Sequence, residues 1–305
     1  GFQNAFISKF NNQNILIWST FFGGSTENYG CHLALNSTGD LYISGEVQTL
    51  NNILPNVYCD VPTNNGFPLC DPGNNAYYQD DYDDVNLVNI NMGWDVFYTK
   101  FNNNRQLIWS TLYGGSADDR NTSTFLPEDI DGGIAIDNKD NVYFCGSSNK
   151  FQYTQGDLYY KDHPNYYLQN TNNGDGPTRD GFLATFDKNC RPIWSTYFGG
   201  FGSWSKGSDL GSAVYISDDQ KLYFVGGTIC GAYPSTFPTV CPASVDPYCQ
   251  PSIVNGGIYY DGFVARFNIY DITGVSDINF ENNGFSTYPN PTDGSFYLTL
   301  DSTFN

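Results

Sequence analysis

The side chains of this chain that could carry chemistry are tyrosines, carboxylates and cysteines, because histidine is almost absent. Its 305 residues include 24 Tyr, 8 Cys, 32 Asp+Glu and 2 His. Four tyrosine pairs stand in polar stretches rich in Asn, Pro and Gly: Tyr77-Tyr78, Tyr159-Tyr160, Tyr166-Tyr167 and Tyr259-Tyr260. Tyrosine joins a rigid apolar ring to a hydroxyl. These pairs therefore either contact a glycan or protein ligand, or pack their stretches in place of a core.

Carboxylates gather in the same stretches. The densest cluster consists of Asp80, Asp81, Asp83 and Asp84. Calcium takes several oxygen ligands from acidic loops, although no cluster here has the D-x-[DN]-x-[DN]-G spacing of an EF-hand loop. The cluster is either a calcium site or a solvated acidic loop. Calcium is the one cofactor that the sequence suggests.

The cysteines favour disulfides over metal binding. No C-x-x-C pair occurs, and two histidines leave few further zinc ligands. Five cysteines stand in loop-like stretches with Pro and Gly: Cys59, Cys70, Cys230, Cys241 and Cys249. We expect disulfides among them, Cys59–Cys70 included, in an oxidising compartment. Cys31 and Cys145 lie in strand-like runs and suit buried free thiols.

Catalytic motifs are missing from the sequence. No G-x-S-x-G, H-E-x-x-H, Walker or G-x-G-x-x-G motif occurs. His32 lies in an expected strand and His163 beside a proline, so both histidines favour structural roles. We predict that the chain is not an enzyme. The alternative is a polysaccharide-active enzyme, a glycoside hydrolase or lyase, which would need two carboxylates about 5–9.5 Å apart.

The charge of the chain excludes some partners. With 13 Lys+Arg the net charge is −19, which repels phosphate backbones and anionic membrane surfaces. We therefore expect no nucleic-acid partner. The sequence has no run of 18 apolar residues, so we expect no transmembrane segment. Because 40% of the residues are hydrophobic, the chain can bury a sizeable core.

An internal repeat is the most informative feature. The octamer I-W-S-T-x-x-G-G occurs three times, at 17–24, 108–115 and 193–200. An alternating run precedes each octamer: AFISKF (5–10), VFYTKF (96–101) and GFLATF (181–186). A fourth run, GFVARF (262–267), has no octamer after it. A strand and hairpin pattern follows each octamer, at 32–45, 133–146 and 213–226.

Each repeat unit thus carries four short strand patterns separated by polar turns. One small sheet cannot cover both of its apolar faces, so repeated sheets must stack, and closing a ring protects the ends. We predict an all-β fold, a β-propeller with blades of four antiparallel strands and long loop inserts. The octamer tryptophans should fill the space between blades, and the Gly-Gly pairs should allow sharp turns. Because propellers have about four to eight blades, we expect further blades or a partner to complete the ring.

The combined pattern of D-x-F-x-x-K-F, I-W-S-T-x-x-G-G and G-I-A-I-D-x-x-x-N-V-Y resembles the SBBP (seven-bladed β-propeller) repeat family of bacterial surface proteins. The resemblance assigns 1–267 to propeller repeats, with units at about 5–93, 94–179 and 180–260 and the first strand of another at 261–267. The units exceed the compact repeat because of inserts at 46–93, 147–179 and 227–260, with a smaller one at 116–131. A fixed insertion point should put the three large inserts on one face.

The tail beyond a linker at 268–283 carries a second resemblance. Residues 284–305 contain the motif Tyr288, Pro289, Asn290, Pro291, Asp293 and Gly294, followed by an alternating strand. This motif resembles the start of the C-terminal sorting domain of type IX secretion substrates in Bacteroidetes. The resemblance implies a β-sandwich that the outer-membrane export machinery recognises. The alternative is a last edge strand.

Together these patterns predict a secreted or cell-surface protein of a bacterium, with a binding, adhesion or surface-structural role. The expected partners are the type IX machinery, through the tail, and a glycan or surface-protein ligand. Besides the enzyme considered above, the alternative is a passive cargo captured with its exporter.

Overall fold

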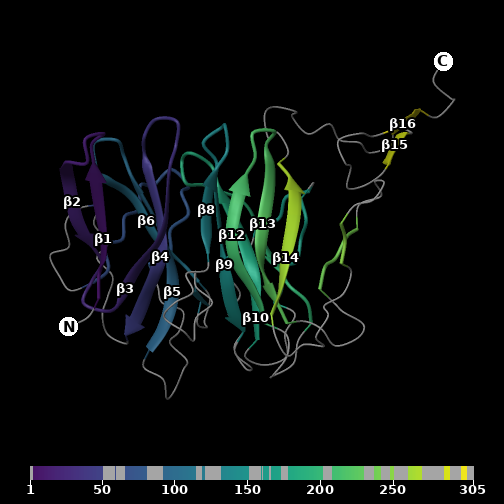
Figure 1. Ribbon diagram of the computed structural model, residues 1–305, viewed down its shortest axis with the longest axis horizontal. Coiled ribbons are helices and arrows are strands. Elements are labelled where there is room, and N and C mark those ends of the chain that lie inside the picture. Colours follow the sequence, from purple (N-terminus) through teal and green to yellow (C-terminus); the bar gives the residue numbers. More distant parts are fainter. Residues whose placement is uncertain are drawn as a thin grey trace. The chain divides into compact units, whose positions relative to one another are not determined.

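The computed structural model is all-β and divides into two compact units, Gly1–Ile269 and Tyr270–Asn305 (Figure 1). The residues that it describes are 3–50, 59, 66–80, 92–114, 119–120, 132–150, 159, 161–164, 166–172, 178–201, 208–229, 237–241, 248–250, 260–269, 285–288 and 297–300. In this part of the chain no helix is long and apolar enough to cross a bilayer.

The described residues of the first unit form four antiparallel sheets, numbered in chain order (Figure 1). The first sheet pairs β1 (Ala5–Phe10) with β2 (Leu16–Phe22). The second has the order β3 (Asn28–Leu35), β4 (Leu41–Leu50), β5 (Met92–Phe101) and β6 (Leu107–Tyr113). The third has the order β11 (Pro192–Phe198), β10 (Thr178–Phe186), β9 (Val142–Lys150) and β7 (Asp119–Arg120), with β8 (Gly133–Ile136) also on β9. The fourth has the order β12 (Asp209–Ile216), β13 (Lys221–Thr228) and β14 (Asp261–Asn268).

Short polar residues close the hairpins between these strands. Asn11, Asn102 and Asp187 open the turns that precede the octamer strands β2, β6 and β11. The side-chain oxygen of each accepts hydrogen bonds from the backbone N–H groups two and four residues later. These bonds replace ladder partners that the turning backbone loses. The same turn is therefore built three times from equivalent residues.

The sheets and the sequence repeats are out of phase. The second sheet takes β3 and β4 from the unit at 5–93, but β5 and β6 from the unit at 94–179. Each large insert therefore joins neighbouring strands of one sheet, and the chain moves to the next sheet after a Gly-Gly pair. One consequence is that the sheets differ in strand number. Of the described strands, two form the first sheet and three the fourth, so the expected four-stranded sheet is complete only in the middle of the stack.

Successive sheets pack face to face, and one hydrophobic cluster fills each of the three interfaces. The octamer tryptophans lie in these interfaces, so they fill space between neighbouring sheets. Each contacts the phenylalanine that ends the alternating strand of the next sheet: the ring centroids are 6.2 Å apart for Trp18–Phe101, 5.5 Å for Trp109–Phe186 and 5.8 Å for Trp194–Phe267.

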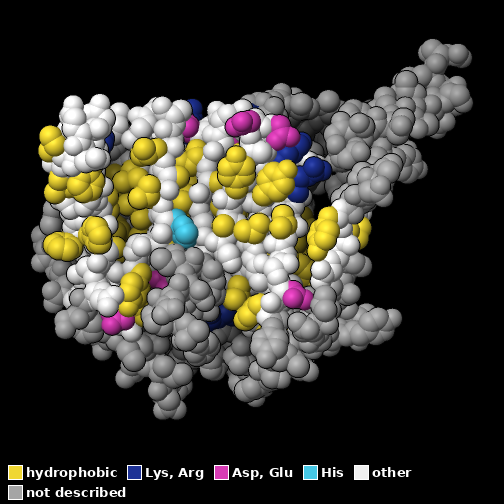
Figure 2. All heavy atoms as spheres, viewed as in Figure 1, with side chains coloured by type: hydrophobic (Ala, Val, Ile, Leu, Met, Phe, Trp, Pro, Cys, Tyr) yellow, Lys and Arg dark blue, Asp and Glu magenta, His cyan; other side chains and the backbone are white. Residues whose placement is uncertain are grey.

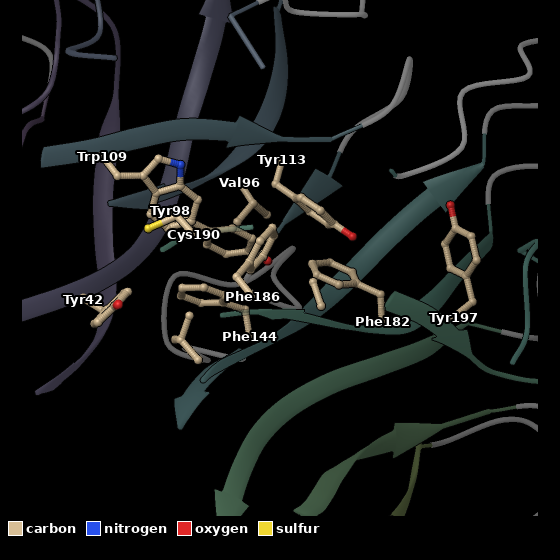
Figure 3. Packing of buried hydrophobic residues seen from close by; sticks show 12 residues of the cluster. Tyr42, Val96, Tyr98, Trp109, Tyr113, Phe144, Phe182, Phe186, Cys190 and Tyr197 are labelled. Atoms are coloured by element: carbon tan, nitrogen blue, oxygen red, sulfur yellow. The ribbon is translucent and has the colours of Figure 1, made fainter. Parts of the chain in front are cut away.

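The interface between the second and third sheets is the most aromatic of those described. Tyr98 from β5 stacks on Phe144 from β9, with ring centroids 3.8 Å apart. Figure 3 shows Trp109 and Tyr113 of the second sheet facing this group. Aromatic contacts of this kind add to the free energy gained from burial alone.

Gly-Gly pairs end the octamer strands where side chains crowd the backbone. A Cβ on Gly199 would lie 2.5 Å from Oδ1 of Asp180 and 2.7 Å from Oδ2 of Asp209. Gly23 has a φ of +150°, and a Cβ there would meet Asn4 and Asn28 at 2.7 and 2.9 Å. Only glycine leaves room for these polar side chains.

The second unit contains one described hairpin. Strand β15 (Phe285–Tyr288) pairs antiparallel with β16 (Tyr297–Leu300), and Tyr288 lies opposite Tyr297. Strand β16 lies within the strand pattern expected after the sorting motif. The other motif residues, Pro289, Asn290, Pro291, Asp293 and Gly294, lie outside the described residues.

Candidate functional site

The predicted binding tyrosines belong to the inserts that join β4 to β5, β9 to β10 and β13 to β14. The structure describes all of them except Tyr160 and Tyr259. It brings Tyr77 and Tyr159 together, with ring centroids 4.7 Å apart. Tyr166 and Tyr167 instead pack against the cluster between the third and fourth sheets. The tyrosines thus form separate groups along the stack.

The first insert runs beside the octamer strand β6. Cys70 and Ser110 exchange two backbone hydrogen bonds, of 2.9 and 3.0 Å. The carbonyl of Tyr77 accepts a hydrogen bond from the indole N–H of Trp109, at 2.8 Å. Further along, the carbonyl of Gln79 accepts one from the backbone N–H of Leu112, at 3.1 Å. The insert therefore covers the outer edge of the second sheet.

The second insert repeats this arrangement beside β11. The indole N–H of Trp194 donates to the carbonyl of Tyr167 at 2.9 Å. The backbone N–H of Gln169 donates to the hydroxyl of Thr196 at 2.8 Å, and Gln169 accepts from the N–H of Tyr197 at 2.9 Å. We call the two equivalent stretches, Tyr77–Gln79 and Tyr167–Gln169, the Tyr-x-Gln segments.

The glutamine side chains complete the contact with the octamer. The amide oxygen of Gln169 accepts hydrogen bonds from the N–H of Gly199 at 3.1 Å and from the hydroxyl of Tyr167 at 3.2 Å. Its amide nitrogen donates to Asp180 at 2.7 Å. In the second sheet the amide oxygen of Gln79 accepts a hydrogen bond from the hydroxyl of Tyr77 at 2.8 Å. Each segment thus recognises the Trp, Thr and first Gly of an octamer.

The Tyr-x-Gln pattern occurs at two further places in the sequence: at 153–155, which lies outside the described residues, and at Tyr248–Gln250 in the third insert. Tyr248 donates to the side chain of Gln250 at 3.4 Å, as in the other two segments. No octamer follows this insert in the sequence, and Tyr248 is 91% exposed. The four occurrences of Tyr-x-Gln are visible in the sequence, and this spacing of Tyr and Gln is the signal that points to the two segments.

Several predicted binding tyrosines are committed to packing. The ring of Tyr77 contacts Tyr113 and Phe186, and Tyr166 lies edge-on to Trp194. Burial, with a smaller contribution from Asp180, raises the pKa of Tyr167 to about 12. These contacts support the packing interpretation for this part of the inserts.

Other tyrosines of the inserts keep part of the side chain in solvent. Tyr159 packs on Tyr77 and is 37% exposed, close to the 36% of Tyr167. Tyr260 is 50% exposed, and Tyr248 is more exposed than any of these. Tyr78 is half-buried, and burial, followed by the charges of Asp80 and Asp71, raises its pKa to about 12. Its hydroxyl therefore remains protonated at neutral pH. Of the predicted binding tyrosines that the structure describes, Tyr159 and Tyr260 are the most exposed.

The carboxylates do not form a described metal centre. Of the predicted calcium ligands the structure describes Asp80, whereas Asp81, Asp83 and Asp84 lie outside the described residues. Among the residues that are described, no three His, Cys, Asp or Glu side chains group as metal ligands would. The calcium hypothesis stays a prediction.

Two disulfides brace the first and third inserts. Cys59 is bonded to Cys70, and Cys241 to Cys249, whereas Cys230 lies outside the described residues. Of the cysteines that the structure describes, Cys31, Cys145 and Cys190 are not in a disulfide. Burial raises the pKa of Cys190 to about 12, and Figure 3 shows it among the aromatic rings. Two disulfides in a β-rich chain are consistent with an extracellular protein.

Comparisons with known proteins do not assign the chain to a family. No protein-family model matches it, and no curated protein matches it. The resemblances of the repeats and of the tail therefore rest on their motifs. Function has to be inferred from the packing of the inserts and from their exposed side chains.

Proposed function

We propose that the chain is a cell-surface protein of the β-propeller type whose inserts bind a glycan or another surface protein. The observation that carries this proposal is the bracing of the inserts. The first two are hydrogen-bonded to octamer strands, and the first is also closed by a disulfide. A braced loop loses little conformational entropy when it binds. Tyr159 lies in one of the two braced inserts, and Tyr260 directly precedes β14. Their exposed rings are contact surfaces of the kind that binding loops use.

The propeller architecture is supported by the repetition of one interface. Three times, the Trp and the aromatic residue near the end of an octamer strand pack on phenylalanines of the next sheet. Sheets related by a constant interface continue the same rotation, and a propeller closes such a series into a ring.

Export by the type IX route is supported by the tail motif and by the disulfides. The experiment is to express the chain in a type IX-competent bacterium, with and without residues 284–305. We expect the complete chain at the cell surface or in the medium, and the shortened chain in the periplasm. Equal export of both chains would contradict the route. Export with no surface binding would favour the passive-cargo alternative.

Binding is tested on a glycan array and on intact bacterial and host cells. A variant with Tyr159→Ala and Tyr260→Ala should lose binding by at least about tenfold. Tyr215→Ala is the matched control, because Tyr215 is 62% exposed but lies on β12 and not on an insert. Uniform absence of binding by the parent chain would count against this role.

The enzyme alternative gains no support from the pair of neighbouring carboxylates that follows the third octamer strand. Asp180 and Asp209 approach the same glycine, but both are fully buried. Their oxygens accept hydrogen bonds from Gln169 and from the backbone of Gly200. A polysaccharide chain therefore cannot reach this pair, which stabilises the turn after the octamer.

A further inference from the structure

Tyr77 of the first insert and Tyr159 of the second form the closest contact between two tyrosine rings of the described residues. The ring centroids are 4.7 Å apart and the ring planes are inclined by 55°. The other two such contacts, Tyr98–Tyr113 and Tyr77–Tyr113, measure 5.3 and 5.6 Å and involve Tyr113, which is 1% exposed. Tyr77 is half-buried and Tyr159 is 37% exposed. The closest pair is therefore also the pair that small molecules in the solvent can reach.

Tyr77 is anchored to two sheets at once. Its carbonyl accepts a hydrogen bond from the indole N–H of Trp109 in the second sheet, at 2.8 Å. Its backbone N–H donates to the carbonyl of Cys190, in the turn before β11 of the third sheet, at 2.9 Å. At the tip of the ring the hydroxyl donates to the side chain of Gln79 at 2.8 Å. The backbone and the ring of Tyr77 are thus both held in place.

Tyr159 is anchored to the same two sheets. Its carbonyl accepts hydrogen bonds from the hydroxyl of Tyr113 on β6, at 2.7 Å, and from the hydroxyl of Ser195 on β11, at 3.0 Å. Tyr77 and Tyr159 belong to inserts of different sheets, yet each is hydrogen-bonded to both the second sheet and the third. Two groups that the fold holds in contact react far faster with each other than with partners from solution.

We propose that Tyr77 and Tyr159 are an oxidative cross-linking site, at which a one-electron oxidant joins the two rings as dityrosine. The oxidant is of the class of a haem peroxidase acting with hydrogen peroxide. It takes one electron and one proton from each phenol, and the two phenoxyl radicals form a carbon–carbon bond between their ortho positions. Each ortho proton then moves to the oxygen of its own ring, which restores both phenols. The two electrons and two protons that were removed reduce one hydrogen peroxide to two waters.

This bond links elements that neither disulfide of the described residues links. The bonds Cys59–Cys70 and Cys241–Cys249 each close a loop within one insert. A Tyr77–Tyr159 bond joins the first insert to the second, and with them the second sheet to the third. Like a disulfide, it restricts the unfolded chain and so favours the folded one. Both kinds of bond form under oxidising conditions.

The test is to treat the purified full chain with a haem peroxidase and hydrogen peroxide at low protein concentration, to isolate the monomer and to digest it with trypsin. No Lys or Arg lies between Lys9 and Lys100, or between Lys150 and Lys161, so the two tyrosines fall into the peptides 10–100 and 151–161. We expect a cross-linked product of these two peptides that is lighter than their sum by two hydrogen atoms. It should show the blue fluorescence of dityrosine.

Four variants assign the bond to this pair. Tyr77→Phe and Tyr159→Phe keep the packed rings but cannot form a phenoxyl radical. Each should lower the yield of the 10–100/151–161 product at least about tenfold, because the remaining tyrosine is no longer held against a second phenol. The matched controls are Tyr78→Phe and Tyr160→Phe, next to the pair in the sequence and in the same two peptides. Tyr78 packs against the cluster between the first and second sheets, and both controls should give the yield of the parent chain.

Exposed tyrosines elsewhere provide the reference for unspecific oxidation. Tyr248 is 91% exposed, and Tyr215, on β12, is 62% exposed. Figure 2 shows hydrophobic side chains at the surface over β12. In the described part of the chain neither ring contacts another tyrosine, so these two should react between chains, in a yield that rises with protein concentration. The yield of the 10–100/151–161 product in the monomer should not depend on protein concentration.

The cross-linked monomer should also unfold at a higher urea concentration than the untreated chain, and its hydrogen exchange should fall in 71–80 and 161–172. An unchanged urea midpoint would contradict the joining of the two sheets. Absence of the 10–100/151–161 product from the parent monomer, or an equal yield from Tyr77→Phe or Tyr159→Phe, would overturn the proposal. Loss of the product in either control variant would do the same, since it would assign the bond to another tyrosine.

Discussion

Ser37 links the second sheet to the third through two hydrogen bonds to one carboxylate. Its backbone N–H and its hydroxyl donate to Asp140, at 2.8 and 2.7 Å. Burial opposes ionisation of Asp140, but these hydrogen bonds, together with the charges of Lys100 and Lys188, outweigh it, and the pKa of Asp140 falls below its ordinary value of 3.8. The equivalent link between the next two sheets, from Asn138 to Gln220 at 3.1 Å, has no ionisable partner.

This difference predicts a pH-dependent contribution to stability. Because the folded-state pKa of Asp140 is lowered, its stabilising effect is present above pH 3.8 and is lost as the pH falls below that value. Asp140→Asn should therefore reduce the free energy of unfolding at pH 7 more than at pH 3. Urea unfolding of the parent and variant chains at pH 7 and at pH 3 measures this difference in the free energy of unfolding. Gln220→Ala is the control, whose effect should not change with pH.

A constant deficit of the Asp140→Asn chain from pH 7 to pH 3 would contradict the assigned pKa shift. Ser37→Ala offers an independent check, since it removes one of the two donors and keeps the carboxylate. It should raise the pKa of Asp140 toward its ordinary value, which NMR titration of the carboxyl carbon can follow.

At the scale of elements, the inserts act as covers for strand edges. Strands β6 and β11 end their sheets, and an uncovered edge invites pairing with other chains. The first and second inserts prevent this by hydrogen-bonding along the octamers. The tyrosine and glutamine of each segment are thus structural residues, which explains why so long an insert can pack without a core of its own.

Replacing either glutamine should loosen its own insert and leave the other in place. Gln169→Leu removes the hydrogen bonds to Gly199 and Asp180, and the loss of a buried polar partner costs about 1–3 kcal/mol. Hydrogen exchange should rise in 161–172 and stay unchanged in 71–80. Gln79→Leu is the matched variant and should show the reverse. A rise in both inserts would mean that they are coupled.

At the scale of the whole first unit, Gly1–Ile269, the free energy of unfolding is the sum of contributions from the interfaces between neighbouring sheets. Each sheet contacts the sheets beside it through one hydrophobic cluster, so the contributions should be nearly additive, as in other repeat proteins. The second and third interfaces are filled by Trp109 and Trp194, which are 0% and 2% exposed, whereas Trp18 at the first interface is only half-buried.

Trp109→Ala should therefore cost about 3–5 kcal/mol of stability, because it leaves a cavity between two complete sheets. Trp18→Ala should cost distinctly less, since part of its ring already lies in solvent. Chemical denaturation followed by circular dichroism compares the two variants. Equal losses would show that the first sheet packs as tightly as the inner ones.

Much of this architecture could be predicted from local patterns. The alternation of apolar and other residues in runs such as GFLATF predicts a strand and shows which side chains share a face. Phe182 and Phe186 share one face of this run, and both are buried. The octamer predicted tryptophans between sheets, and a Pro- and Gly-rich loop predicted the bond between Cys59 and Cys70.

The pairing of strands across the inserts could not be predicted from the sequence. Strand β4 pairs with β5 across an insert of some forty residues, and no local pattern shows whether a hairpin pairs with the strands before or after it. The same holds for Tyr167, whose carbonyl and ring are committed to Trp194 and Phe198 of a distant strand. Strands, turns and the repeat can be predicted from the amino-acid sequence, because these features depend on residues that are close together in the chain. Sheet composition and the roles of the tyrosines depend on long-range contacts, which exist only once the chain has folded.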